Sequence, residues 1–229
     1  MLNPASPPST RFGKGARRVV TSKVQGKRSV TDVIEEYGAM ADARLKPLFA
    51  EKNLLHPPQE VALLAVKQDK LVELWAREGT RWTLIKKYPV QAASGRLGPK
   101  LREGDRQVPE GIYRVERLNP NSAYHLSMKL DYPNAYDVQR AREEGRNRPG
   151  CDIFIHGRDH SNGCLAMGDD AIEELFVLAA RIGKENVRII IAPTDPRQDK
   201  LSPPPVAPRW VTRLYRNIEQ EFLKVSQKG

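Results

Sequence analysis

The sequence predicts a mainly β protein of the α+β class, with one helix before and one helix after a strand-rich centre. Two observations predict this fold. Short apolar segments separated by turn residues fill the centre of the chain, and amphipathic helical patterns flank them. The 229 residues are enough to bury a substantial core. No apolar run approaches the ~20 residues of a membrane-spanning helix, so we expect no membrane span.

Residues 1–28 are predicted to be a disordered basic leader. Seven of the ten net positive charges lie within residues 1–30, which contain no acid. Such a segment can bind nucleic acid, anionic lipid or an anionic cell-wall polymer, or it can be a solvated leader. The rest of the chain has no basic stripe with interleaved aromatic residues, so we do not expect nucleic acid as a partner. The leader also lacks the apolar stretch of ~7–15 residues that a secretion signal requires.

A helical segment is predicted over residues 29–58. Ser29 and Asp32 have the spacing of a capping box, in which each side chain accepts the backbone N–H of the other residue. The apolar residues that follow recur at helical spacing and give the helix one apolar face. The pair Pro57-Pro58 prevents the helix from continuing.

The strands are predicted in two groups. The first group is an antiparallel meander over residues 61–66, 70–76 and 82–88. Residues 91–111 are punctuated by Gly and Pro and are predicted to form a loop. The second group is a pair of strands over residues 112–118 and 124–130, joined by a turn at residues 119–121.

Residues 131–150 are polar and show no clear period, so we expect a long irregular excursion between strands. Hydrophobic periodicity then predicts a short strand, a helix, a buried strand and a closing helix, in that order. Their ranges are 152–156, 169–182, 187–192 and 210–225, with a Pro-rich crossing before the last.

The most informative chemistry lies in residues 153–167. The predicted strand carries His156 to its end, and Cys164 follows eight residues later, directly after Gly163. An imidazole beside a thiol favours the nucleophilic thiolate, which makes His156 the candidate general base and Cys164 the candidate nucleophile. Gly157 allows the chain to turn after the strand, and the amides of Gly163 and Cys164 are candidate donors to an oxyanion.

The residues alone leave other interpretations open. A cysteine beside a glycine is often a small core residue, and a histidine at a strand end is often a structural hydrogen-bond partner. The cluster of His156, Asp159, His160 and Cys164 could also suggest metal ligands. A loop does not align them as a helix would, so we expect neither a metal nor another cofactor. Cys151 could pair with Cys164, but the intervening strand should separate them, so we expect Cys151 to be a spectator.

From His156 to Cys164 the pattern His-Gly-x-x-x-Ser-x-Gly-Cys resembles the active-site signature of the YkuD-type L,D-transpeptidases. Further similar segments occur in the same order along residues 60–195, some of them similar to the YafK-like branch in particular. They are residues 98–100, 104–113, 118–122, 132–137 and 163–167. We therefore expect a YkuD-like catalytic domain over residues 59–195. The leader and the helical segment precede it, and the Pro-rich crossing and the C-terminal helix follow it over residues 196–229.

This resemblance implies a β-sandwich-like catalytic domain with Cys164 as nucleophile at the mouth of a cleft. It implies His156 as general base, oriented by a backbone carbonyl rather than by a carboxylate. The implied activity is a cysteine-dependent L,D-transpeptidase that acts on diaminopimelate-containing peptidoglycan stem peptides through a thioester acyl-enzyme. Such a substrate implies a periplasmic location, with a signal that this chain does not contain.

Two alternatives accompany this expectation. One is a hydrolase that releases an outer-membrane lipoprotein from diaminopimelate, which would make that lipoprotein a second partner. The other is a peptidoglycan-binding module without catalysis. The sequence also departs from many family members, which carry His at the position of Asn162 and Arg or Asn at the position of Ala166.

The remaining candidate residues have supporting roles. Ser161, Asn162 and Gly157 are expected to support the oxyanion region together with Gly163. Arg158 is a candidate to bind a substrate carboxylate, because a guanidinium can bind a carboxylate in a bidentate manner, or it is simply a solvated arginine. Tyr132 and Asn134 are expected to line the cleft, although a Pro-Asn pair also simply shapes turns.

Overall fold

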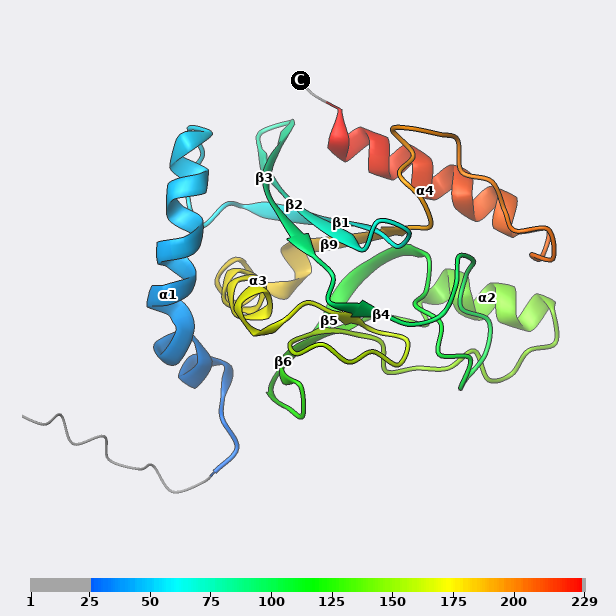
Figure 1. Ribbon diagram of the computed structural model, residues 1–229, viewed down its shortest axis with the longest axis horizontal. Coiled ribbons are helices and arrows are strands. Elements are labelled where there is room, and N and C mark those ends of the chain that lie inside the picture. Colours follow the sequence, from blue (N-terminus) through cyan, green and yellow to red (C-terminus); the bar gives the residue numbers. More distant parts are fainter. Residues whose placement is uncertain (1–25, 228–229) are drawn as a thin grey trace, which may run out of the picture.

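The computed structural model describes residues 26–227, so almost all of the predicted leader lies outside the described residues. The described chain combines helices with one continuous sheet (Figure 1). The helices are α1 (Val30–Glu51), α2 (Ala135–Glu143), α3 (Asp169–Ile182) and α4 (Val211–Ser226), with a 3₁₀ turn at Lys184–Asn186. The strands are β1 (Glu60–Val66), β2 (Leu71–Glu78), β3 (Arg81–Pro89), β4 (Ala92–Ala93), β5 (Gly111–Ser122), β6 (His125–Leu130), β7 (Phe154–His156), β8 (Leu165–Ala166) and β9 (Val187–Ala192).

The sheet has the strand order β3-β2-β1-β9-β5-β6-β7-β8-β4, which confirms the predicted α+β class. The predicted meander is present as β1 to β3, and β9 pairs in parallel with β1. The long strand β5 belongs to both halves of the sheet. Its first residues pair with β9, and from Val115 onward it pairs with β6, with register shifts after Val115 and after Asn119. Such bulges bend a strand, and here the bend lets the sheet curl.

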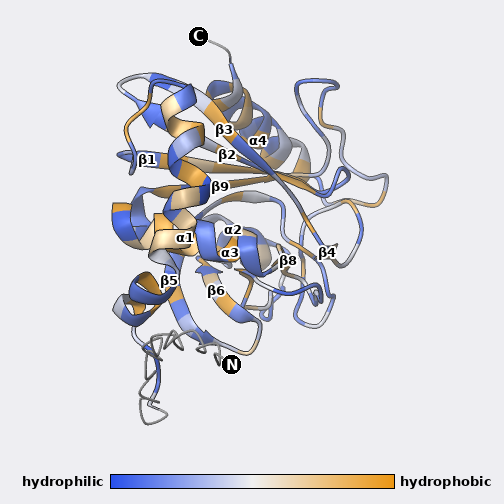
Figure 2. Ribbon diagram, turned by 60° about the vertical axis from the view of Figure 1, so that its left-hand side comes forward, coloured by the Kyte–Doolittle hydropathy of each residue, from blue (hydrophilic) through white to orange (hydrophobic). Residues whose placement is uncertain are grey.

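Both faces of the central strands are covered by helices. Along β1, Leu63 and Ala65 belong to a core cluster that includes residues of α1 and α3, whereas Ala62 and Leu64 belong to a second cluster formed with α4. Alternate residues of a strand point to opposite faces, so both faces of β1 are apolar. Figure 2 shows this as hydrophobic stretches along β1 and β9, between the helices. The first cluster also contains Met128 of β6, so the two halves of the sheet share a core.

Several predicted elements are confirmed. Helix α1 begins at Val30 with the expected capping box, in which the Ser29 hydroxyl accepts the N–H of Asp32 at 3.1 Å. The bounds of α3 and β9 agree with the predicted helix and strand. Among the described residues, no helix is both long and apolar enough to cross a membrane.

Three local predictions are wrong. Residues 91–111, predicted as a loop, contain the two-residue strand β4, which is too short to show a period. The excursion at 131–150 contains α2, whose sequence is charged and buries only Ala141, so it has no apolar stripe to detect. The turn expected at residues 119–121 lies after Ser122, because β5 continues through these residues. The side chain of Asn121 binds the backbone of Arg28 there, with its amide donating at 2.7 Å and its oxygen accepting at 2.8 Å. This contact with the start of the described chain holds an otherwise turn-like sequence extended.

Candidate active site

His156 ends β7, and its side chain is buried. Its Nδ1 lies 2.7 Å from the carbonyl oxygen of Gly157. A carbonyl oxygen can only accept, so Nδ1 carries the proton and Nε2 carries the free lone pair. The ring of Tyr124 packs against the imidazole with 4.5 Å between ring centroids. These contacts hold the ring in one orientation and leave Nε2 available as a base.

A glycine is needed at position 157 because a Cβ atom would not fit there, and not because the chain turns at this residue. This corrects the expectation for Gly157. A Cβ atom on Gly157 would lie 2.6 Å from Oδ1 of Asp169 and 2.8 Å from the carbonyl oxygen of Tyr124. The left-handed conformation belongs instead to Arg158, with φ of 57°. The backbone N–H of Arg158 donates to Oδ1 of Asp169 at 2.8 Å, which stabilises the turn from β7 toward the start of α3.

Strand pairing brings Cys164 to the same face as His156. Strands β7 and β8 are parallel, with Ile155 opposite Leu165 and His156 opposite Ala166. Cys164 directly precedes β8, two positions before Ala166. Because alternate residues of a strand share a face, Cys164 projects from the face that carries His156, about 7 Å away along the strand direction.

The electrostatics of the pair favour neutral forms at rest. Burial raises the pKa of the Cys164 thiol, and a backbone hydrogen bond with Phe154 and the charge of Lys100 counteract this only in part. Burial also lowers the pKa of His156, although its hydrogen bond to Gly157 opposes the shift and the neighbouring His160 adds to it. A neutral imidazole can accept the thiol proton when a substrate is attacked.

The loop before β8 is held by two serines. The hydroxyl of Ser161 donates to the carbonyl oxygen of Cys164 at 2.7 Å and accepts the N–H of Cys164 at 3.2 Å. The hydroxyl of Ser94 accepts the N–H of Gly163 at 2.6 Å. The two amides expected to bind an oxyanion are therefore occupied by hydroxyl groups in this conformation, which corrects the expectation of open donors. Ser161 thus holds the loop through the backbone of Cys164, and Asn162 is exposed.

Tyr132 and Asn134 are used within the fold instead of lining a cleft. Tyr132 is buried, its hydroxyl donates to the carbonyl oxygen of Pro149 at 2.9 Å, and burial raises the pKa of that hydroxyl. The Asn134 side chain caps α2 by accepting two backbone N–H groups, and it donates to the carbonyl oxygen of Ile112 at 3.1 Å. The sequence pattern around Asn134 is thus a helix cap rather than a binding motif.

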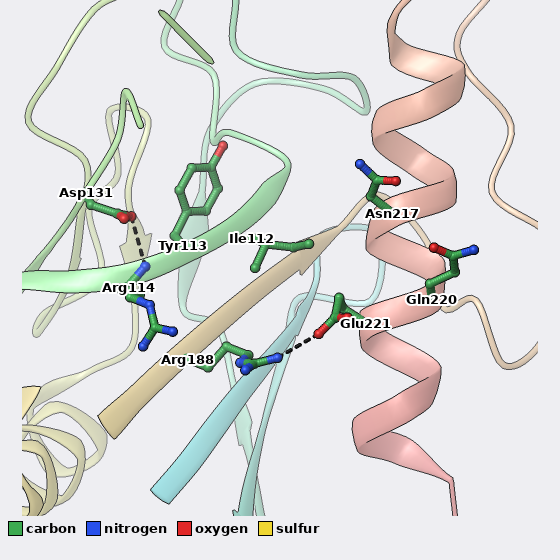
Figure 3. Close-up of a pocket in the computed structure, with 8 residues that line it drawn as sticks. All are labelled: Ile112, Tyr113, Arg114, Asp131, Arg188, Asn217, Gln220 and Glu221. Atoms are coloured by element: carbon green, nitrogen blue, oxygen red, sulfur yellow. Dashed lines mark hydrogen bonds and ion pairs between the residues drawn. The ribbon is translucent and has the colours of Figure 1, made fainter. Parts of the chain in front are cut away.

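Arg158 also lies apart from the thiol. Its side chain is exposed and lines a pocket of about 700 Å³ with Asp159, Lys86 and the first residues of α3. Figure 3 shows another pocket, of about 480 Å³, between β5, β9 and α4. An ion pair of 2.6 Å between Arg188 and Glu221 lies in it. Neither pocket is lined by Cys164 or His156.

A groove of about 570 Å³ lies beside the Cys164 loop. Gly95 and Gln107 line it, and the carbonyl oxygen of Gln107 lies 3.3 Å from where a Cβ atom of Gly163 would be. The exposed residues Arg96 and Arg102 contribute guanidinium groups. Exposed apolar side chains and prolines of the crossing before α4 form another wall. The groove therefore combines positive charge with apolar surface.

Both cysteines are free thiols, Cys151 exposed and Cys164 buried. The Cys151 thiol donates to the Asp152 carboxylate at 3.3 Å, and this contact raises the pKa of the thiol. Among the described residues, no three His, Cys, Asp or Glu side chains are arranged to hold a metal ion.

Comparisons with known proteins identify the family. The family model described as the YkuD L,D-transpeptidase catalytic domain matches residues 60–191. The YafK proteins of Escherichia coli K12 and O157:H7 are each 36% identical over 132 residues, which cover 56% of this chain and 51% of theirs. The chain thus spans about half the length of the curated relatives it matches.

Two solved structures are also similar. The helical cell shape determining protein Pgp2 from Campylobacter jejuni is 19% identical, with a TM-score of 0.49 over 68% of this chain and 56% of that chain. Bd1075 from Bdellovibrio bacteriovorus is 19% identical, with a TM-score of 0.46 over 73% of this chain and 55% of that chain.

Proposed function

Because the chain belongs to the YkuD family of L,D-transpeptidase catalytic domains, we propose that it is a cysteine-dependent L,D-transpeptidase. Its proposed substrate is the diaminopimelate-containing stem peptide of peptidoglycan, and its proposed location is the periplasm, where this polymer lies. Cys164 is the nucleophile and His156 is the general base. The proposal is supported by the β7–β8 register, which when extended by one pair assigns Cys164 to the face of His156, and by the Gly157 carbonyl that orients the His156 ring.

The proposed chemistry has two steps. Nε2 of His156 takes the thiol proton as Sγ of Cys164 attacks the carbonyl carbon of the diaminopimelate residue. A C–S bond forms, the C–N bond breaks, and the leaving amine takes the proton from His156. An acceptor amine then attacks the thioester, giving its proton to His156, and a new amide bond replaces the C–S bond as the thiol is restored.

The groove beside the Cys164 loop supports a peptide substrate. A stem peptide carries free carboxylates, and a guanidinium binds a carboxylate in a bidentate manner. Arg96 and Arg102 supply such groups next to exposed apolar side chains. Arg158 stays a second proposed carboxylate site, in the pocket at the start of α3, and Cys164 lines neither that pocket nor this groove.

A hydrolase is the second candidate, with water in place of the acceptor amine and release of a lipoprotein from diaminopimelate. The position of Ala166 is the reason to retain the hydrolase as a second candidate. Many family members carry Arg or Asn there, but Ala166 is fully buried and pairs with Ala92 between β8 and β4. A long polar side chain has no room at this position, so substrate contacts differ from those of such members.

The first experiment tests the nucleophile by intact mass after incubation with a carbapenem. We expect one adduct on the wild-type protein and on Cys151→Ala, and none on Cys164→Ala. The Cys151→Ala variant is a matched control, because it removes the only other thiol of the chain. An undiminished adduct on Cys164→Ala, or no adduct on the wild type, would contradict the proposed mechanism and favour a binding module.

A second experiment separates the two outcomes of the acyl-enzyme. The protein is incubated with purified muropeptides, with and without lipoprotein-linked material, and the products are identified by mass spectrometry. Cross-linked diaminopimelate dimers are expected for a transpeptidase. Released lipoprotein without dimers would reject transfer and support the hydrolase.

A further inference from the structure

We propose that Ser94 is a positioning residue that holds the Gly163-Cys164 backbone in its reactive conformation. The proposal rests on the proposed role of Cys164 as nucleophile. Ser94 lies in the segment after β4, where the sequence shows only Gly and Pro punctuation and no motif that marks a functional serine.

Strand register places Ser94 opposite the nucleophile. Strands β4 and β8 are antiparallel, with Ala92 opposite Ala166 and Ala93 opposite Leu165. The next pair in this register is Ser94 and Cys164. Two paired residues are too few to hold two segments together by a ladder alone. The side chain of Ser94 therefore continues the pairing beyond the end of the strands.

The hydrogen bonds around Ser94 have one consistent set of directions. Its single hydroxyl proton goes to the carbonyl oxygen of Arg106 at 2.8 Å, so its oxygen accepts the N–H of Gly163 at 2.6 Å. The hydroxyl proton of Ser161 goes to the carbonyl oxygen of Cys164, so the Ser161 oxygen accepts the N–H groups of Cys164 and of Ser94, the latter at 3.1 Å. With both protons used, the two hydroxyl oxygens touch at 3.3 Å without a hydrogen bond between them.

Ser94 thereby joins its own segment to Gly163, which lies 69 residues later in the chain. On one side it binds the backbone of Arg106, and on the other it binds Gly163. Gly163 has φ of 91°, a left-handed conformation that only glycine adopts readily. Removing the Ser94 hydroxyl leaves the N–H of the buried Gly163 and the exposed carbonyl of Arg106 without this partner. The loop can then shift, and a shift of about 1 Å in a reacting group can slow a reaction about 100-fold.

The experiment uses the Cys151→Ala background, so that every thiol reading reports Cys164. Two measurements are made on each variant: the rate of carbapenem acylation and the pH dependence of iodoacetamide alkylation. The variants are Ser94→Ala, Ser94→Thr and a control, Ser202→Ala, in the exposed Pro-rich crossing. We expect Ser94→Ala to lower the acylation rate about 10- to 100-fold. We expect alkylation at neutral pH to rise, because a loosened loop exposes the thiol and its raised pKa falls. Ser94→Thr keeps a hydroxyl and should recover most of the acylation rate.

A wild-type measurement tests the same contact without a variant. The Gly163 amide should be strongly protected from hydrogen exchange in the resting protein, and rapid exchange would overturn the proposal. Unchanged acylation and an unchanged alkylation profile in a folded Ser94→Ala protein would also overturn it. If the wild type is not acylated but Ser94→Ala still changes the alkylation profile, the positioning role stands and the proposed function fails.

Discussion

Nδ1 of His156 lies 2.7 Å from the carbonyl oxygen of Gly157, the next residue in the chain. A backbone carbonyl orients the imidazole as a carboxylate would, but it carries no net charge to stabilise the imidazolium. Burial therefore dominates and lowers the pKa of His156. The resting site then combines a neutral imidazole with a neutral thiol, and these protonation states lead to specific expectations for mutation and pH.

The first prediction concerns His156 and Cys164 as a unit. His156→Ala and Cys164→Ala should each abolish nearly all turnover on muropeptides, and the double variant should be no worse than either single one, because one step requires both groups. His160→Ala should have a mild effect, since His160 is exposed and only perturbs the pKa of His156. Turnover measured by mass spectrometry decides this, and a larger loss from His160→Ala would assign the base differently.

The second prediction concerns the pH dependence of acylation. The rate should rise with pH through a pKa below ~6.5, the ordinary value for histidine, because burial lowers the pKa of His156 and the base must be neutral. It should not fall again near pH 7, because the thiol has a raised pKa and stays protonated until it is attacked.

His160→Ala should move this acid limb to higher pH, because the charge of His160 lowers the pKa of His156. Carbapenem acylation followed by intact mass across pH 4–9 measures both profiles. If the pKa of the acid limb lies above the pKa of free histidine, a charged partner orients the His156 ring rather than Gly157.

The third prediction concerns the buried ion pair between Lys67 and Glu110, which holds the loop carrying Ser94. The Glu110 carboxylate accepts from Nζ of Lys67 at 2.9 Å, from the N–H of Gly98 at 2.7 Å and from the Tyr215 hydroxyl at 2.6 Å. Glu110→Gln should lower the free energy of unfolding by about 3–5 kcal/mol, because it leaves a buried lysine charge unpaired.

Urea unfolding measures this loss, with the exposed Glu143→Gln as the matched control. Lys67→Met combined with Glu110→Gln should lose less than Glu110→Gln alone, because the unpaired charge is then gone. A double variant less stable than the single one would show that the pair does not act through its buried charge.

The fourth prediction concerns Asp137, at the start of α2. Burial raises the pKa of its carboxyl to about 6. A raised pKa means that folding favours the protonated form, so this contribution to stability is present below pH ~4 and is lost as pH rises through about 6. Asp137→Asn keeps an oxygen for the cap and does not ionise. Its stability relative to the wild type should therefore increase by roughly 1–3 kcal/mol between pH 4 and pH 7.

Urea unfolding at several pH values measures this difference. The matched control is Glu143→Gln, which changes an exposed carboxyl on the same helix. A difference between Asp137→Asn and the wild type that stays constant from pH 4 to pH 7 would contradict the raised pKa.

Local signals in the sequence determined much of the fold. The capping box at Ser29, the apolar face of α3 and the apolar run of β9 depend on residues close together in the chain, and the structure contains all three elements. The charged helix α2 escaped prediction because its stability comes from its cap at Asn134 and from packing rather than from an apolar stripe.

The motif from His156 to Cys164 was also legible in the sequence, since its residues lie within one strand and one loop. The sequence did not show whether the backbone N–H groups of that loop are free to bind an oxyanion. Two hydroxyl groups occupy the amides of Gly163 and Cys164, and one of the two comes from Ser94 through the pairing of β4 with β8.

Sequence by itself thus determined the class of fold, most of its helices and strands, and the candidate nucleophile and base. Only the tertiary structure decided which residue takes the left-handed turn at Arg158, which carbonyl orients His156, and which serine holds Gly163. The physical reason is that periodicity and caps act over a few residues, whereas these contacts depend on strand register and close packing between segments far apart in the chain.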